Sequence, residues 1–239
     1  MIALEGITVR FGGLVALDAI SARFGAPVSG IIGPNGAGKT TTMNVISGFL
    51  TPKSGSVVVD GTDLVALPPH IRPRWGLRRS FQREQIAEDL SVRDNLLSLA
   101  DNLPGSRAVR RADVGGALEF VGIAALADRM GATLNTYERR LTDLARCLVG
   151  QPRLIMLDEP AGGLTVGESA HLGDVILRIR DFCKAQVLVI DHDVDLITRI
   201  CAETLVLDFG RRIAFGPTAQ VLADPAVKAA YLGVEMDHA

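Results

Sequence analysis

The chain has 239 residues, of which 48% are hydrophobic and 22% are charged, and its formal net charge is −2 at pH 7. This composition is typical of a globular protein, and the length is sufficient for a large α/β domain with a sizeable core. The slightly acidic balance argues against a general nucleic-acid binder, which normally carries a basic excess.

Membrane spans and metal-binding cysteine clusters are not expected from the sequence. No apolar run approaches the roughly eighteen residues of a spanning helix, so we expect any membrane role to be peripheral and to act through partners. Residues 1–5 lack the basic and apolar regions of a signal peptide. Cys147, Cys183 and Cys201 lack metal-ligand spacing, which is typical of reduced thiols in a cytosolic chain.

The N-terminal part of the chain predicts a β-hairpin. Apolar residues alternate over residues 2–10 and again over 17–24, and Gly12-Gly13 between them predicts a turn. Phe11 lies beside this turn. It is either an ordinary core residue or, because a phosphate-binding loop follows, a platform for an adenine ring.

The next segment carries the strongest motif, G-x-x-x-x-G-K-T, between an apolar run at 28–32 and a helical run at 41–49. Its glycines allow successive backbone N–H groups to converge on an anion at the start of a helix. Lys39 can then reach the β- and γ-phosphates, and Thr40 can offer its hydroxyl to Mg²⁺. The expected phosphate-binding residues are Gly33, Pro34, Asn35, Gly36, Ala37, Gly38, Lys39, Thr40 and Thr41.

The middle of the chain changes from strand to helix periodicity. After a predicted strand at 56–60, the prolines of 65–76 indicate a short helix with an irregular entry. The basic clusters at 72–74 and 78–79 are interpreted as a solvated or partner-facing patch rather than a DNA site. Residues 77–82 then predict a strand that ends on Gln82.

Helical periodicity follows from Ser91 to about Gly131. Ser91 is expected to cap a helix over 92–99, residues 101–113 are expected to form a loop or short flexible insertion, and a further helix is expected at 137–150. An α-helical subdomain is thus expected to interrupt an α/β core.

Two later strands are expected to deliver polar side chains to one edge of a sheet. The apolar run 154–157 ends in Asp158 and Glu159, which are suited to hold the Mg²⁺ shell and to polarise the attacking water. The strand at 186–190 is followed by His192, either an ordinary surface or core histidine or a contact to the γ-phosphate. The remaining expected elements are helices at 167–182, 194–201 and 218–231 and strands at 204–208 and 212–215.

Together these motifs resemble those of the ATP-binding cassette (ABC) transporter ATPases over essentially the whole chain. In that family Gly33–Thr41 correspond to Walker A, Leu154–Glu159 to Walker B, Gln82 to the Q-loop glutamine and His192 to the switch histidine. The resemblance implies an α/β fold of the P-loop NTPase type. Its core is a mainly parallel sheet with helices, with an N-terminal antiparallel β subdomain and an inserted α-helical subdomain.

The resemblance also implies domain limits and roles for single residues. It predicts one ABC ATPase domain over 1–239, with a core at about 1–85 and 152–239 and a helical subdomain at about 86–151. The implied cofactors are ATP and Mg²⁺. The implied catalytic residues are Glu159, His192 and Gln82; the loop residues 33–41 and Phe11 would bind ATP; Thr40, Gln82 and Asp158 would bind Mg²⁺.

Finer features resemble the ATP-binding subunits of branched-chain amino-acid uptake systems. They are Phe11-Gly12-Gly13-Leu14, Arg79-Ser80-Phe81-Gln82, Ala145-Arg146-Cys147 and Tyr231-Leu232-Gly233. This resemblance implies a peripheral ATPase on the cytoplasmic face of the cell membrane. Its implied partners are a pair of transmembrane permease subunits, a second related ATPase and an extracytoplasmic binding protein, without nucleic acid.

One segment departs from the family pattern. Residues 134–138 read Leu-Asn-Thr-Tyr-Glu where the family has a Leu-Ser-Gly-Gly-Gln-like signature that approaches the γ-phosphate held by the opposite subunit. Tyr137 would crowd that approach, and Glu138 adds negative charge near a phosphate. Asn135 and Glu138 still have capping-box spacing, so a helix can begin here. The D-loop aspartate is replaced by Thr165, which weakens a second contact between subunits.

These departures favour a heterodimer over a homodimer. A self-paired chain would carry two degraded signatures, so we expect weak ATPase activity from the chain alone. In a heterodimer, the site built on this chain's Walker motifs would hydrolyse ATP if the partner's signature is intact, and the other site would mainly bind it.

The sequence therefore predicts the ATP-hydrolysing subunit of an importer, for branched-chain amino acids by resemblance. Importers of urea or short amides use similar subunits, and a lipopolysaccharide-export ATPase with similar loops is the nearest alternative. Phe81-Gln82 and Phe11-Gly12-Gly13-Leu14 favour import. A soluble ABC ATPase acting on DNA or the ribosome is less favoured, because the chain has neither tandem cassettes nor long coiled coils. A small-molecule kinase is also disfavoured, because its reaction does not require His192 and a Q-loop at these spacings.

Overall fold

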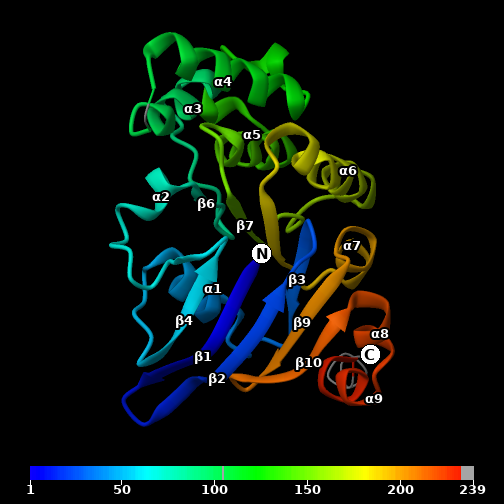
Figure 1. Cartoon of the computed structure of the whole chain (residues 1–239). Coiled ribbons are helices and arrows are strands. Elements are labelled where there is room, and N and C mark those ends of the chain that lie inside the picture. Colours follow the sequence, from blue (N-terminus) through cyan, green and yellow to red (C-terminus); the bar gives the residue numbers. More distant parts are fainter. Residues whose placement is uncertain (104, 233–239) are drawn as a thin grey trace. The chain divides into compact units, whose positions relative to one another are not determined.

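The computed structural model describes residues 1–103 and 105–232, whose elements are labelled in Figure 1. Contacts divide the chain into two compact units. Unit 1 comprises Met1–Arg72 and the chain from Leu188 onward, and unit 2 comprises Pro73–Val187. The chain returns from unit 2 to unit 1 within strand β8 (Gln186–Ile190). The sequence-based limits of a core and a helical subdomain stay a prediction.

An antiparallel sheet in unit 1 confirms the expected N-terminal hairpin. Its strands β1 (Ile2–Phe11), β2 (Leu14–Phe24), β4 (Ser54–Val59) and β5 (Thr62–Asp63) are ordered β2-β1-β4-β5. The alternating apolar side chains of β1 are buried, so one face of the sheet supplies core. Gly12 has φ 58°, which suits glycine in the turn between the first two strands.

Parallel strands in unit 1 position the phosphate loop. All residues of β3 (Val28–Ile32) are buried, and this strand pairs in parallel with β9 (Glu203–Asp208), which forms a hairpin with β10 (Arg211–Pro217). Burial of every residue is typical of a parallel strand covered on both faces. Helix α1 (Lys39–Ser47) begins directly after the loop that follows β3.

The remaining helical elements of unit 1 are α7 (Val194–Ile200), α8 (Thr218–Ala223), α9 (Pro225–Val227) and a π-helical turn at Lys228–Leu232. Gly233 of the predicted Tyr-Leu-Gly ending lies outside the described residues.

Unit 2 combines a parallel strand pair with helices. Strand β6 (Leu77–Arg79) pairs in parallel with β7 (Leu154–Asp158). The helices are α3 (Val92–Ala100), α4 (Arg107–Phe120), α5 (Thr136–Leu148) and α6 (Val166–Cys183), with 3₁₀ turns at Ala124–Leu126 and Gly131–Thr133. Helices α3, α4 and α5 contact one another, as Figure 1 shows in green. A short helix, α2 (Arg72–Trp75), lies where the chain enters this unit.

Two predicted elements of unit 2 are wrong in extent. The strand expected over 77–82 ends at Arg79, so Gln82 lies in a loop. The loop expected over 101–113 ends early, because α4 begins at Arg107 with the Ser106 side chain accepting a hydrogen bond from the Val109 N–H. A serine cap followed by arginines, which are good helix formers, explains this start.

The interpretation of the basic clusters as a solvated patch is also wrong for Arg72, Arg78 and Arg79. Arg72 and Arg78 are each 4% exposed, and the Arg79 side chain is 6% exposed. Arg72 donates to the carbonyls of Val45 and Ile46 at the end of α1, and Arg78 donates to carbonyls such as that of Val149. These guanidinium groups therefore satisfy backbone acceptors inside the protein.

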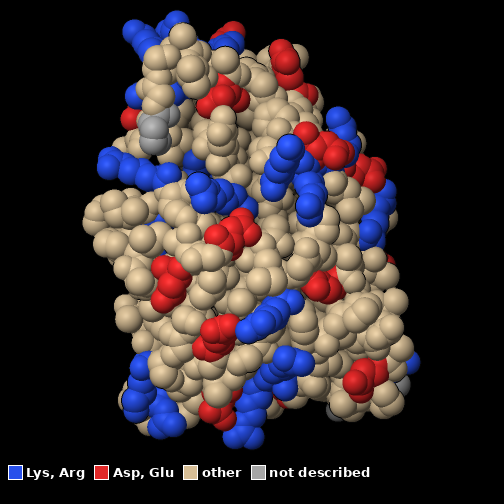
Figure 2. Space-filling view, viewed as in Figure 1, with Lys and Arg blue, Asp and Glu red and all other residues tan. Residues whose placement is uncertain are grey.

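On the face shown in Figure 2, Lys and Arg side chains are interspersed with Asp and Glu side chains.

Replacing Arg72 with methionine is expected to destabilise the protein by ~3 kcal/mol, because charged hydrogen bonds are lost and buried carbonyls of α1 are left without them. Urea unfolding measures the change. Arg74→Met is the matched control, since Arg74 is exposed and its loss is expected to cost within about 0.5 kcal/mol. Equal effects of the two substitutions would contradict the capping role of Arg72.

Candidate functional site

The phosphate loop in unit 1 adopts the conformation that its glycines were expected to allow. Gly33, Gly36 and Gly38 have φ angles of 149°, 80° and 106°. An added Cβ at Gly33 would lie 2.1 Å from the carbonyl oxygen of Leu207, and one at Gly38 would lie 2.7 Å from a methyl group of Leu17. At Gly36 nothing lies within 4 Å of such an atom. The loop is thus packed tightly at its two ends and open in the middle.

The side chain of Lys39 lies inside this loop. It is 9% exposed, and its Nζ donates to the carbonyls of Gly33 at 2.6 Å and Pro34 at 3.0 Å. Helix α1 begins at Lys39, and its first backbone N–H groups have no partner within the helix. A buried ammonium and a helix N-terminus both favour an anion here, so the loop fits a nucleotide phosphate.

The other expected nucleotide-binding residues of unit 1 differ in exposure. Asn35 and Thr40 are exposed, Pro34 and Thr41 are partly buried, and Ala37 is buried, which leaves the first two accessible to a ligand. Phe11 ends β1 and is 52% exposed, so it is not the ordinary core residue that was the alternative reading. An exposed ring at the end of a strand suits stacking on a base.

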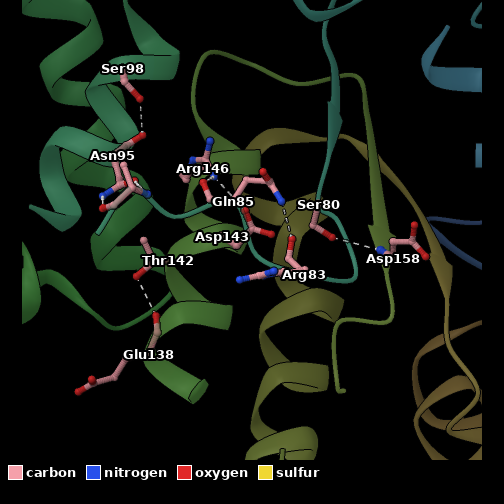
Figure 3. Close-up of polar contacts among 11 residues, drawn as sticks. Ser80, Arg83, Gln85, Asn95, Ser98, Glu138, Thr142, Asp143, Arg146 and Asp158 are labelled. Carbon is pink, nitrogen blue, oxygen red and sulfur yellow. Dashed lines mark hydrogen bonds and ion pairs between the residues drawn. The ribbon is translucent and has the colours of Figure 1, made fainter. Parts of the chain in front are cut away.

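In unit 2, strand β7 ends at Asp158, a carboxylate held by the neighbouring strand. The Arg79 guanidinium lies 3.0 Å from its Oδ2, and both side chains are almost fully buried. The Asp158 backbone N–H donates to the Ser80 hydroxyl at 3.1 Å, as Figure 3 shows. Arg79 and Ser80 support Asp158 but were not predicted as site residues, although an arginine in a short buried strand signals an internal partner.

Gln82 and Glu159 lie together in the same unit. The Gln82 Nε2 donates to the Glu159 Oε2 at 2.8 Å. Glu159 has φ 48°, a left-handed conformation that is uncommon for a residue other than glycine. The structure therefore brings together two of the three residues predicted to be catalytic.

His192 lies in unit 1, just after β8. Its side chain is 67% exposed, and its Nδ1 lies 3.6 Å from the Oδ1 of the buried Asp191. Because Asp191 also accepts a hydrogen bond from the Asp193 backbone N–H, this carboxylate orders the turn that carries His192.

The segment 134–138 begins helix α5 with the predicted capping box. The Asn135 side chain accepts from the Glu138 N–H, and the Glu138 carboxylate accepts from the Asn135 N–H. Glu138 also pairs with Arg129 at 2.6 Å, so its negative charge is compensated locally. Tyr137 bonds through its hydroxyl to the His171 Nδ1, and burial together with the nearby Glu168 raises the pKa of the tyrosine. Thr165 caps α6 in the same way, with Glu168 as its partner.

Helix α5 also fastens the chain that follows Gln82. Arg146 donates to the Gln85 carbonyl and pairs with Asp143 at 3.2 Å, as Figure 3 shows. Burial raises the pKa of Asp143 to about 6, against the opposing effect of Arg146.

The cysteines are free, as expected, and burial raises the pKa of Cys201 to about 12. Within residues 1–103 and 105–232, no group of three or more His, Cys, Asp or Glu side chains is arranged to hold a metal ion. Mg²⁺ is commonly bound through one or two carboxylates together with substrate phosphates, and the single carboxylate of Asp158 fits that mode. In the same described part of the chain, no helix has both the length and the apolar character required to cross a bilayer.

Comparison with known proteins identifies relatives over almost the whole chain. Residues 25–162 match the family described as ABC transporter, and residues 211–237 match the family described as branched-chain amino acid ATP-binding cassette transporter. The high-affinity branched-chain amino acid transport ATP-binding protein BraF of Pseudomonas aeruginosa is 34% identical over 98% of each chain. The lipopolysaccharide export system ATP-binding protein LptB of Escherichia coli is 35% identical over 86% of each chain. The ADP conformation of MJ1267, an ATP-binding cassette of an ABC transporter, superposes with a TM-score of 0.87 at 28% identity, covering 98% of each chain.

Two glycine substitutions separate the packing of the loop from its conformational requirement. Gly36→Ala meets open space and is expected to cost about 1–2 kcal/mol of unfolding free energy, from the left-handed backbone alone. Gly33→Ala is expected to cost clearly more, because its Cβ would also overlap the Leu207 carbonyl oxygen. Thermal or urea unfolding of both variants measures the difference. A smaller loss for Gly33→Ala than for Gly36→Ala would show that the loop is not packed as described.

Proposed function

The chain belongs to the ABC transporter family of ATP-binding cassettes, and we propose that it is the ATPase subunit powering an importer of branched-chain amino acids. The main support is the similarity to BraF over 98% of both chains. The match of residues 211–237 to a branched-chain amino acid transporter family supports the same cargo. Family ATPases bind and hydrolyse ATP, and the tightly packed phosphate loop suits that activity.

We assign the predicted residues to roles in the reaction. The loop residues 33–41 would bind the phosphates, with Lys39 as their charged contact, and Phe11 would stack on the base. Thr40, Gln82 and Asp158 would hold Mg²⁺, which supplies positive charge against the β- and γ-phosphates. The Glu159 carboxylate would orient and polarise the attacking water, supported by its hydrogen bond from Gln82. His192, whose side chain is largely exposed, would contact the γ-phosphate.

We further propose that the subunit works on the cytoplasmic face of the membrane with two permease subunits and a second, different ATPase. An extracytoplasmic binding protein would deliver the cargo. The altered segment 134–138 supports a heterodimer, because Tyr137 replaces a glycine and its ring is tied to His171. Export of lipopolysaccharide is the second candidate. It rests on LptB, which aligns over 86% of the chain and is therefore a shorter match than BraF.

The cargo is tested with the transporter complex purified with its permeases and reconstituted in vesicles with its binding protein. Leucine, isoleucine and valine are expected to stimulate ATP hydrolysis and to be taken up, whereas urea and short amides are not. Glu159→Gln is expected to bind ATP and to abolish both responses. Stimulation by urea or an amide alone would reassign the cargo, and association with a lipopolysaccharide-export permease would favour export.

The asymmetry of the dimer gives a separate expectation. The chain alone is expected to hydrolyse ATP weakly, and the assembled complex is expected to have one hydrolytic site per ATPase dimer. Turnover per dimer, measured with Glu159→Gln introduced into this chain or its equivalent into the partner, identifies the active site. Strong cooperative hydrolysis by the isolated chain, or two equivalent sites in the complex, would contradict the heterodimer.

A further inference from the structure

We propose that Arg140 on helix α5 is a positioning residue for the Gln82–Glu159 pair, holding the main chain on both sides of that hydrogen bond. The inference rests on the proposed function, which assigns the attacking water to Glu159. It concerns residues of unit 2 alone. Arg140 does not act on the nucleotide directly; it acts through the two residues that it holds.

The geometry places one guanidinium between two main-chain segments. The Arg140 Nη1 donates to the Gln82 carbonyl at 3.1 Å, and its Nη2 donates to the Gly162 carbonyl at 3.1 Å. Gly162 in turn donates its N–H to the Glu159 carbonyl at 3.1 Å, closing the turn that begins at Glu159. The side chains of Gln82 and Glu159 meet at 2.8 Å between these two anchored segments. A shift of either segment would therefore change the distance between the amide and the carboxylate.

The orientation of this guanidinium is itself restrained. Its Nε lies 2.9 Å from the Glu84 Oε1, and the Arg140 and Glu84 side chains are only 10% and 14% exposed. The ion pair places a carboxylate beside the Nε side of the guanidinium, while the two terminal nitrogens reach the carbonyls. Gly162 allows this approach, since an added Cβ there would lie 3.2 Å from the Arg140 Nη2. A lysine would keep the charge beside Glu84 but has no such fork.

Neighbouring arginines on α5 provide an internal comparison. Arg139 donates to the Gly131 carbonyl and lies 3.7 Å from Glu88, and Arg146 donates to the Gln85 carbonyl (Figure 3). Arg146 thereby fastens the chain after Gln82 to the helix, whereas the Arg139 contacts lie at Gly131 and Glu88. Arg140 differs from them because it also reaches the turn that follows Glu159. Its loss is therefore expected to affect the reaction and not only the attachment of the helix.

The physical clamp is tested by hydrogen exchange on the full chain. Arg140→Lys is expected to raise amide exchange in two separate segments, residues 82–87 and 160–163, whose bonded N–H groups at Ala87 and Gly162 lose a neighbouring carbonyl anchor. Arg139→Lys is the matched control on the same helix and is expected to raise exchange in neither. Gly162→Ala perturbs the same contact from its other end and is expected to reproduce the Arg140→Lys pattern. Increased exchange in only one segment, or in none, would overturn the clamp.

The catalytic consequence is tested by single-turnover hydrolysis in the assembled complex at saturating ATP. Arg140→Lys is expected to lower the rate about 10–100-fold, the scale expected for a misplacement of about 1 Å. The Kd for ATP is expected to change less than about twofold, since the proposed interaction is not with bound ATP. In a Gln82→Ala background the same substitution is expected to add little, because residues acting through one interaction are not additive.

Two outcomes separate this proposal from the function on which it rests. A normal rate for Arg140→Lys, or a fully additive loss with Gln82→Ala, would overturn the positioning role while leaving the ATPase assignment intact. Normal hydrolysis by Glu159→Gln would instead overturn the role of Glu159, and the exchange measurements would still decide whether Arg140 holds the two segments.

Discussion

Buried guanidinium groups that bind main-chain carbonyls hold the irregular segments of this protein in place. Loops that carry functional residues leave carbonyls without partners in regular structure, and burying such groups unpaired is costly. Arg72 supplies donors to the end of α1, Arg78 to the carbonyl of Val149, and Arg140 to those of Gln82 and Gly162. Each arginine therefore fixes the main chain of a loop or a helix end. Of these contacts, those of Arg140 hold the segments that carry Gln82 and Glu159.

The phosphate loop obeys a different constraint, which is steric. Its ends approach the neighbouring backbone and side chains so closely that only glycine fits at positions 33 and 38. The middle of the loop is open around Gly36, and the Lys39 ammonium is buried beside it. The loop is therefore fixed at Gly33 and Gly38 and accessible at Gly36.

The altered segment at the start of α5 shows how a helix can keep its structure while its surface changes. Asn135 and Glu138 satisfy the backbone groups of the first turn, so the helix does not need the glycines of the family signature. The Glu138 carboxylate pairs with Arg129 and accepts the N–H of the capping residue Asn135. What changes is a side chain in the first turn of the helix, where the Tyr137 hydroxyl bonds to His171. The cap therefore keeps the helix start independent of which side chain occupies position 137.

By itself the sequence determined the family, the fold class and the phosphate loop, because these depend on local patterns: alternation in β1, the mainly apolar segments of β3 and β7, and glycines at fixed offsets. It also determined the helix caps at Ser91 and Asn135, which involve neighbours in the chain. It misjudged Arg72, Arg78 and Arg79, because charge alone does not reveal that a side chain folds inward onto carbonyls or a carboxylate from distant segments. Only the tertiary structure decided those partners, and with them the roles of Arg79 and Arg140, since residues far apart in the chain meet only once the helices and strands have packed.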